Sequence, residues 1–153
     1  QAFPDALVDA VDICPDALAL AGENVALHDL EGRVRLHEGN LFAPLEAARY
    51  DIIVSNPPYV PAIDVDGAPP EFAHEPRSAL LADDDGMAVV DAILASAHLH
   101  LTENGVLFVE VGASWPGVEE RYSHLPFQWV DLERGGEGIF VIERDGLVLH
   151  YGD

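Results

Sequence analysis

The chain contains no lysine, so its positive charge comes entirely from seven arginines, which oppose 28 acidic residues and leave a net charge of -21. A surface of this sign repels phosphate backbones, because nucleic-acid binding depends on Lys and Arg. A basic protein partner would instead be attracted. High-salt or solubility adaptation, with Arg replacing Lys through coding bias, explains the composition equally well. The charge therefore argues against a nucleic-acid substrate more strongly than for any particular protein partner.

Cysteine and long apolar runs are also scarce. The single cysteine, Cys14, excludes an internal disulfide and a multi-cysteine metal site, which fits a reducing compartment. No apolar run reaches membrane-spanning length, and the first residues lack the features of a signal peptide. The seven histidines have no carboxylate partners at metal-ligand spacing. We expect a soluble, cytoplasmic protein without a metal and without a membrane partner.

Length and apolar content predict one domain. A chain of 153 residues with 49% hydrophobic content can bury one core, and no low-complexity tract suggests a second. We therefore expect residues 1–153 to belong to a single domain.

Hydrophobic periodicity predicts an alternating α/β order. The expected strands and helices are strand 7–13, helix 15–28, strand 34–37, strand 52–54, a long ordered loop over 60–85, helix 86–101, strand 106–111, helix 115–122, strand 127–132 and strand 138–144. The last two strands are expected to pair antiparallel across the glycine-rich turn at 135–138. The β-branched run Ile52-Ile53-Val54 predicts a central parallel strand that is covered on both faces.

The most informative segment is Asn56-Pro57-Pro58-Tyr59, which directly follows that apolar strand. The two prolines end the strand and stiffen the loop. In open α/β sheets, ligands bind beyond the carboxyl ends of the strands. An amide and a phenol held rigidly at this position are therefore candidates for function.

Five segments of the chain resemble the S-adenosylmethionine-dependent methyltransferases that methylate an amide or exocyclic amine nitrogen. These segments are Asn-Pro-Pro-Tyr at 56–59, Val-Asp-Ile-Cys-Pro-Asp-Ala-Leu at 11–18, Gly-Asn-Leu-Phe at 39–42, His-Glu-Pro-Arg-Ser-Ala-Leu at 74–80, and Gly-Gly-Glu-Gly at 135–138. The segment at 74–80 looks like the HemK/PrmC class of protein N5-glutamine methyltransferases. The approach Pro-Pro-Glu-Phe at 69–72, together with the glycines at 135–138, looks most like the branch of this class that modifies large-subunit ribosomal protein L-three.

The resemblance implies a class I methyltransferase fold, which is a Rossmann-like sheet with a closing antiparallel hairpin. This fold begins with a strand and a Gly-rich turn that binds the methionine end of the cofactor. No Gly-x-Gly lies between a strand and a helix here, and the glycines at 135–138 precede a strand, whereas such a turn requires a helix N-terminus. The expected sheet therefore lacks its first strand and the Gly-rich motif, and the chain is expected to be the carboxyl-terminal part of a longer catalytic domain.

The resemblance also assigns the cofactor site. Asp12 would accept hydrogen bonds from the ribose hydroxyls of S-adenosylmethionine, and Ile13 would offer an apolar surface to adenine. Asn40 and Leu41 would hold the adenine edge. Helix capping by Asp12 and an ordinary turn at Asn40 are the structural alternatives.

Asn56 is the expected catalytic centre and would contact both cofactor and substrate. Its side-chain oxygen and the Pro57 carbonyl could accept the two N–H bonds of a substrate amide and aim the nitrogen at the methyl group. Pro58 stiffens the loop, and Tyr59 could stack on the amide. Glu75 is assigned to the wall of the substrate channel, where an internal ion pair is the alternative role.

Three functions remain open from the sequence. The first is methylation of a glutamine side chain in a protein, with the basic ribosomal protein L-three as the implied substrate. The second is N6-adenine methylation of DNA or RNA, which shares the Asn-Pro-Pro-Tyr loop but requires a basic strand-binding surface. The third is a catalytically silent fragment that serves as a structural module. The sequence does not determine the oligomeric state.

Overall fold

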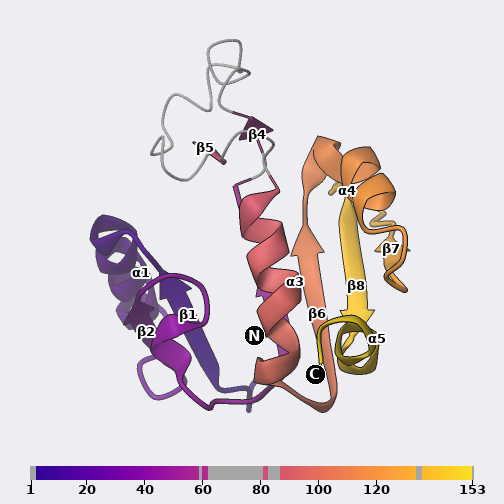
Figure 1. Cartoon of the computed structure of the whole chain (residues 1–153). Helices are drawn as coiled ribbons and strands as arrows, with labels where there is room; N and C mark the ends of the chain where they lie inside the picture. Colours follow the sequence, from indigo (N-terminus) through magenta and orange to yellow (C-terminus); the bar gives the residue numbers. More distant parts are fainter. Residues whose placement is uncertain (1–2, 59, 62–80, 83–86, 134–135, 153) are drawn as a thin grey trace. The chain divides into compact units, whose positions relative to one another are not determined.

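The computed structural model describes residues 3–58, 60–61, 81–82, 87–133 and 136–152. The chain forms two compact units, Gln1–Ala48 and Arg49–Asp153. Each unit is described by itself below (Figure 1).

The first unit is a βαβ arrangement. It contains β1 (Val8–Asp12), α1 (Pro15–Leu27), β2 (Val34–Glu38) and the short 3-10 helix η1 (Ala43–Leu45). The two strands pair in parallel, with Val8 opposite Val34 and Asp12 opposite Glu38. Pro15 lies at the start of α1 and Asp16 in its first turn, where a missing N–H and a negative charge are both well tolerated. The predicted strands and helix of this region are confirmed.

The second unit is built on a four-stranded sheet in the order β3-β6-β8-β7. Its strands are β3 (Tyr50–Ser55), β6 (Leu101–Glu110), β7 (Gln128–Val130) and β8 (Ile139–Glu143). β3 pairs in parallel with β6, whereas β8 pairs antiparallel with both β6 and β7. The predicted closing hairpin is therefore confirmed. The helices are α3 (Ala88–His100), α4 (Trp115–Arg121), the 3-10 helix η4 (Gly112–Ser114) and α5 (Arg144–Tyr151).

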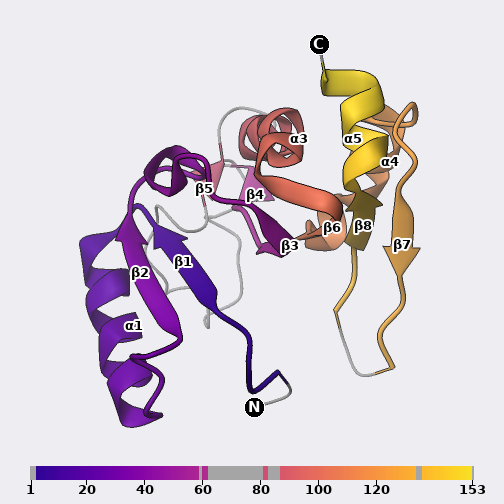
Figure 2. The ribbon, with the colours of Figure 1, turned by 90° about the horizontal axis from the view of Figure 1, so that it is seen from below.

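One face of this sheet carries the core. Figure 2 shows α3 and α5 on the same side of the strands. Alternate residues of β6 and β8 point into this layer, and Leu107, Val109 and Phe140 are fully buried there. Burial of each such side chain stabilises the folded chain by about 1.5–3 kcal/mol. Of the helices in the described residues, none combines the length and apolar character that crossing a membrane requires.

The other face of β3 is exposed within this unit. Ile52 and Val54 have exposed fractions of 53% and 75%, and β3 is the edge strand of its sheet. The prediction that this strand is covered on both faces is therefore wrong for the unit. An apolar run indicates which side chains favour burial, but it does not show which elements supply the cover.

Two further regions differ from the sequence-based expectation, and a third lies mostly outside the described residues. The residues between the expected helix 86–101 and the expected strand 106–111 lie inside β6, where the pairing jumps from Tyr50 opposite Leu101 to Ile52 opposite Val106 and accommodates the extra residues as a bulge. Helix α5 was not predicted. The predicted loop over 60–85 falls mostly outside the described residues, which include only the paired two-residue strands β4 (Val60–Pro61) and β5 (Leu81–Ala82).

Two glycines cross closely where β6 ends and β8 begins. Gly112 and Gly138 both have positive φ, of 48° and 67°. A Cβ added to Gly138 would lie 2.2 Å from the Gly112 carbonyl oxygen. The Val111 N–H also donates to the Gly138 carbonyl at 2.8 Å. The last glycine of the 135–138 segment is therefore required by this backbone contact.

We predict that Gly138→Ala destabilises the second unit by about 1–3 kcal/mol or more, because the new Cβ meets a carbonyl oxygen and the backbone conformation is strained for alanine. Urea unfolding measures the loss. Gly117→Ala is the matched control, since Gly117 lies in α4 with nothing near its Cβ position and alanine favours a helix by up to about 1 kcal/mol. Equal effects of the two substitutions would contradict the proposed role of the crossing.

The carboxyl end of α3 is held by two arginines. Arg49 and Arg144 donate to the His98 carbonyl at 3.4 and 3.1 Å. The His98 side chain is only 8% exposed, and its Nδ1 has no hydrogen-bond partner among the described residues. Burial lowers the pKa of His98 and the positive charge of Arg144 lowers it further, the backbone of Ala95 opposes the shift in part, and the charge of Arg49 adds to the lowering. The folded chain therefore favours the neutral imidazole.

We predict that the free energy of unfolding decreases as the pH falls below 6.5, the ordinary pKa of histidine. The unfolded chain binds a proton at His98 in this range, whereas the folded chain resists it, so the loss continues until the pH reaches the lowered folded-state pKa. His98→Gln should flatten this part of the stability profile in urea titrations at a series of pH values. An unaltered slope in the His98 variant would show that His98 does not cause the loss of stability below pH 6.5.

Candidate active site

The Asn-Pro-Pro segment lies at the carboxyl end of β3, as predicted. Asn56 follows the last strand residue, Ser55, and is exposed, whereas Pro57 is buried and Pro58 half-buried. The buried ring anchors the segment while the amide of Asn56 faces outward. Tyr59 and Glu75, which the sequence also assigned to the site, lie outside the described residues.

The neighbouring strand ends beside this segment. The parallel register places Ser55 opposite Val109, so the carboxyl ends of β3 and β6 lie next to each other. Because β8 is antiparallel to β6, its first residue, Ile139, is paired with Glu110 at the same edge. The edge of the sheet at the carboxyl ends of β3 and β6 therefore contains Asn56, Glu110 and the crossing of Gly112 with Gly138.

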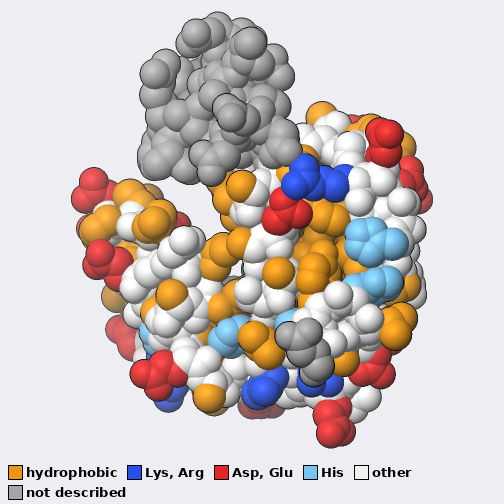
Figure 3. Space-filling model, viewed as in Figure 1, with side chains coloured by type: hydrophobic (Ala, Val, Ile, Leu, Met, Phe, Trp, Pro, Cys, Tyr) orange, Lys and Arg blue, Asp and Glu red, His pale blue; other side chains and the backbone are white. Residues whose placement is uncertain are grey.

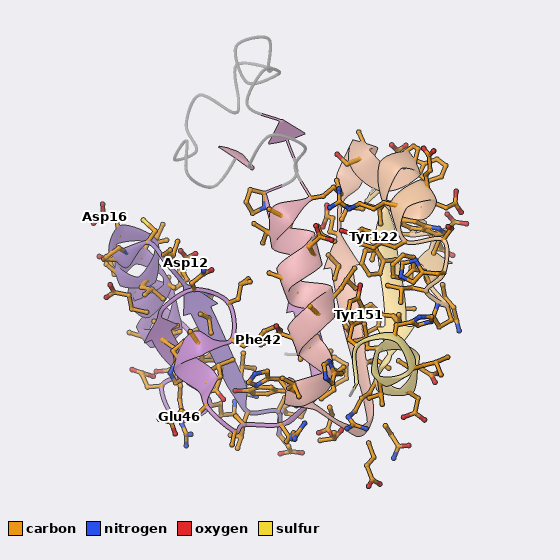
Figure 4. The ribbon with its side chains drawn as sticks, viewed as in Figure 1. Asp12, Asp16, Phe42, Glu46, Tyr122 and Tyr151 are labelled. Carbon is orange, nitrogen blue, oxygen red and sulfur yellow. The ribbon has the colours of Figure 1, made fainter. Side chains whose placement is uncertain are left out.

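Asp12 ends β1 in the first unit and precedes α1 (Figure 4). One oxygen of its carboxylate, Oδ1, accepts the Cys14 N–H at 2.8 Å. This bond orders the turn before α1 but does not cap the helix, because the N-cap residue is Cys14 and no side-chain hydrogen bond caps α1. The side chain is exposed, and no other described residue hydrogen-bonds to its second oxygen. That oxygen is available to a ligand.

Asn40 and Leu41 lie at the same edge of the first unit. The Gly39 N–H donates to the Asp12 carbonyl at 3.0 Å, which ties the end of β2 to the end of β1. Asn40 is exposed, and Leu41 has φ of 49°, so the backbone turns sharply at this point. The structure therefore brings Asp12, Ile13, Asn40 and Leu41 together within one unit.

These donors and acceptors fit an adenosine. A carboxylate oxygen suits a ribose hydroxyl, and the Ile13 side chain, 65% exposed, offers an apolar surface beside it. Asn40 adds both a donor and an acceptor for a base edge. The Asn56, Pro57 and Pro58 group belongs to the second unit, and the two groups each lie at the carboxyl ends of parallel strands in their own unit.

Sequence reasoning missed two polar features of the second unit. Asp91 on α3 accepts hydrogen bonds from the Tyr122 hydroxyl and from Arg121, both at 2.5 Å, and joins α4 to α3. Burial raises the pKa of Tyr122, and the hydrogen bond to Asp91 raises it further.

The second missed feature is Glu110, which the sequence analysis counted only as part of an apolar strand. Its place at a strand end was the available signal.

Comparison with known proteins identifies the class. The family described as Methyltransferase small domain matches residues 1–120, and the chain belongs to this family. A methyltransferase structure from Pyrococcus furiosus superposes with a TM-score of 0.59 at 16% identity, covering 90% of this chain and 62% of that one. The class I methyltransferase fold expected from the sequence is confirmed.

Two curated relatives are more similar to this chain in sequence than the Pyrococcus furiosus structure is. Both are named ribosomal protein uL3 glutamine methyltransferase. The protein from Francisella tularensis is 44% identical over 97% of this chain and 47% of its own length, and the protein from Bradyrhizobium diazoefficiens is 46% identical over 95% and 46%. The chain spans about half the length of these curated relatives.

Proposed function

We propose that the protein transfers a methyl group from S-adenosylmethionine to a glutamine side-chain nitrogen of a protein. The observation that carries this proposal is the position of Asn56. Its exposed amide is anchored by a buried proline at the carboxyl end of β3, in a chain that belongs to a methyltransferase family. Ligands of α/β sheets bind at such strand ends.

The proposed substrate is the large-subunit ribosomal protein L-three, named uL3 in the relatives. Two relatives at 44% and 46% identity carry this substrate in their names. The net charge of -21 supports a basic protein substrate and disfavours nucleic acid. We expect the reaction in the cytoplasm. We also propose that the chain is the carboxyl-terminal part of the catalytic domain, and that the rest of the protein completes the site.

Four residues of the first unit would hold the cofactor. The free oxygen of Asp12 would accept from the ribose, Ile13 would lie against the adenine, and Asn40 and Leu41 would flank the base edge. The bond from the Cys14 N–H fixes the Asp12 carboxylate and leaves its second oxygen to the ligand. When bound, S-adenosylmethionine supplies an electrophilic methyl group on a sulfonium.

Asn56 would orient the substrate amide. The nitrogen of an amide is a weak nucleophile because its lone pair is delocalised into the carbonyl. The Asn56 side-chain oxygen and the Pro57 carbonyl would accept its two N–H bonds and direct the lone pair toward the methyl group. Pro58 limits movement of the loop. Tyr59 is proposed to stack on the amide and Glu75 to line the channel.

We predict that Asp12→Asn weakens binding of S-adenosylhomocysteine to the full-length enzyme by about tenfold or more, because a hydrogen bond to a charged group contributes about 1.5–3 kcal/mol. Isothermal titration calorimetry measures the affinity. Asp16→Asn is the matched control, since Asp16 is an exposed carboxylate in the first turn of the adjacent helix. Equal affinity of the Asp12 variant and the native enzyme would remove Asp12 from the site.

We predict that the full-length enzyme incorporates labelled methyl into protein L-three and that Asn56→Ala lowers kcat by about 100-fold or more, because the amide is no longer oriented. Affinity for S-adenosylhomocysteine should fall only modestly. Mass spectrometry of the product locates the methyl group on glutamine. Asn104→Ala, at an exposed position in the bulge of β6, controls for a general effect of losing an amide.

The same assay separates the alternatives when release factors, DNA and RNA are included as substrates. Incorporation into DNA or RNA alone would replace the glutamine proposal with adenine methylation. Absence of transfer to every substrate, together with absence of cofactor binding, would identify a structural module. An unchanged rate for Asn56→Ala would show that this residue does not orient the substrate.

A further inference from the structure

Glu110 is the carboxylate that the fold places beside Asn56. The last paired residues of β3 and β6 are Ser55 and Val109, and the next residues along the two parallel strands are Asn56 and Glu110. Neighbouring strands of a sheet lie about 4.8 Å apart. Glu110 therefore ends its strand within side-chain reach of a ligand held by Asn56.

The backbone of Glu110 is held on both sides. Glu110 itself is paired with Ile139 of β8, and the preceding residue, Val109, is paired with β3. The following residue, Val111, donates its N–H to the Gly138 carbonyl at 2.8 Å. The contact of Gly138 with Gly112 then fixes the chain one residue further on. The carboxylate therefore extends from a rigid support.

The side chain of Glu110 is half-buried, and its carboxylate makes no polar contact with the described residues. Alternation along β6 buries Leu107 and Val109 completely and leaves Phe108 and Glu110 partly exposed on the other face. In the described part of the chain, no hydrogen bond or ion pair involves the Glu110 carboxylate. By contrast, Asp91 is bound by Arg121 and Tyr122, and Asp51 accepts from Thr102.

We infer that Glu110 accepts the proton that the substrate amide nitrogen loses on methylation, an inference that rests on the proposed function. The nitrogen forms its bond to carbon as the carbon–sulfur bond breaks and leaves its electron pair on sulfur. The nitrogen then carries two hydrogens and a positive charge. One proton passes to a carboxylate oxygen of Glu110, the N–H electron pair returns to nitrogen, and Glu110 later releases the proton to water.

This role complements that of Asn56. The amide oxygen of Asn56 accepts a hydrogen bond but is too weak a base to take the proton. A carboxylate can take it, and its negative charge also stabilises the positive charge that develops on nitrogen. Positioned acid–base groups of this kind contribute about 10²–10⁴-fold to a rate.

The test uses the full-length enzyme with protein L-three. Glu110→Gln should lower kcat by about 10²–10⁴-fold, while KM for the protein and the affinity for S-adenosylhomocysteine stay near native values. Glu110→Ala should regain part of its kcat when formate is added, because formate can occupy the vacated space and accept the proton. Formate should not accelerate the native enzyme or Asn56→Ala. Glu119→Gln, at an exposed position on α4, is the control for loss of charge.

An equilibrium measurement adds a readout that does not depend on turnover. Sinefungin carries an ammonium group in place of the sulfonium methyl, so a nearby carboxylate attracts it more than the neutral S-adenosylhomocysteine. Glu110→Gln should weaken sinefungin binding by about fivefold or more relative to S-adenosylhomocysteine, since fivefold is the effect of losing one charge pair about 4 Å apart even in bulk water. Calorimetry with both ligands measures the ratio.

Two results would overturn the inference while leaving the proposed function intact. One is native kcat in Glu110→Gln. The other is a loss of kcat that formate does not restore and that parallels a loss of thermal stability, with no change in the ratio of ligand affinities. Failure of the native enzyme to methylate any glutamine would instead refute the proposed function and this inference together.

Discussion

The position of β6 between β3 and β8 determines most of the second unit. Parallel pairing with β3 places the ends of both strands at one edge, and antiparallel pairing with β8 returns the glycine segment to that edge. The alternate residues of β6 meanwhile form the layer beneath α3 and α5. One strand thus organises the core and the candidate site through its backbone on both sides and its buried side chains.

The sequence predicted this architecture well where a signal was local. Pro15 and Asp16 marked the start of α1, and Pro57 and Pro58 marked the end of β3, because their restricted backbones or charges act within a few residues. Helix α5 gave no comparable signal, since Leu147 is its only fully buried residue and Gly146 interrupts the pattern. The bulge in β6 also depends on a partner strand, which the local pattern does not reveal.

The residues of the candidate site also divide into those with a local sequence signal and those that depend on distant parts of the chain. The Asn-Pro-Pro segment and Asp12 were found from strand-end positions, whereas the nearness of Glu110 to Asn56 follows from the register, in which Ser55 is opposite Val109. The requirement for glycine at 138 likewise comes from Gly112, which is distant in sequence. Register and backbone crossings are long-range properties, so the sequence alone did not predict them. The roles assigned to these residues remain predictions.

The arginines serve the fold more than they form a basic surface. Arg33 donates to the carbonyls of Phe3 and Pro4, Arg49 and Arg144 bind the end of α3, and Arg121 binds Asp91. Figure 3 shows acidic side chains on the surfaces of both units, with few arginines among them. Each of these arginines keeps its positive charge, so the net charge of -21 follows from the excess of 28 acidic residues over seven arginines.

The aromatic residues have a practical consequence for optical experiments. Trp115 and Trp129 pack edge to face with ring centroids 5.9 Å apart, and they are the only two tryptophans of the chain. The first 48 residues contain no tryptophan and no tyrosine. Intrinsic fluorescence therefore reports on the second unit alone, while far-ultraviolet circular dichroism detects both. Comparing melting curves from the two methods would reveal whether the units unfold together or separately.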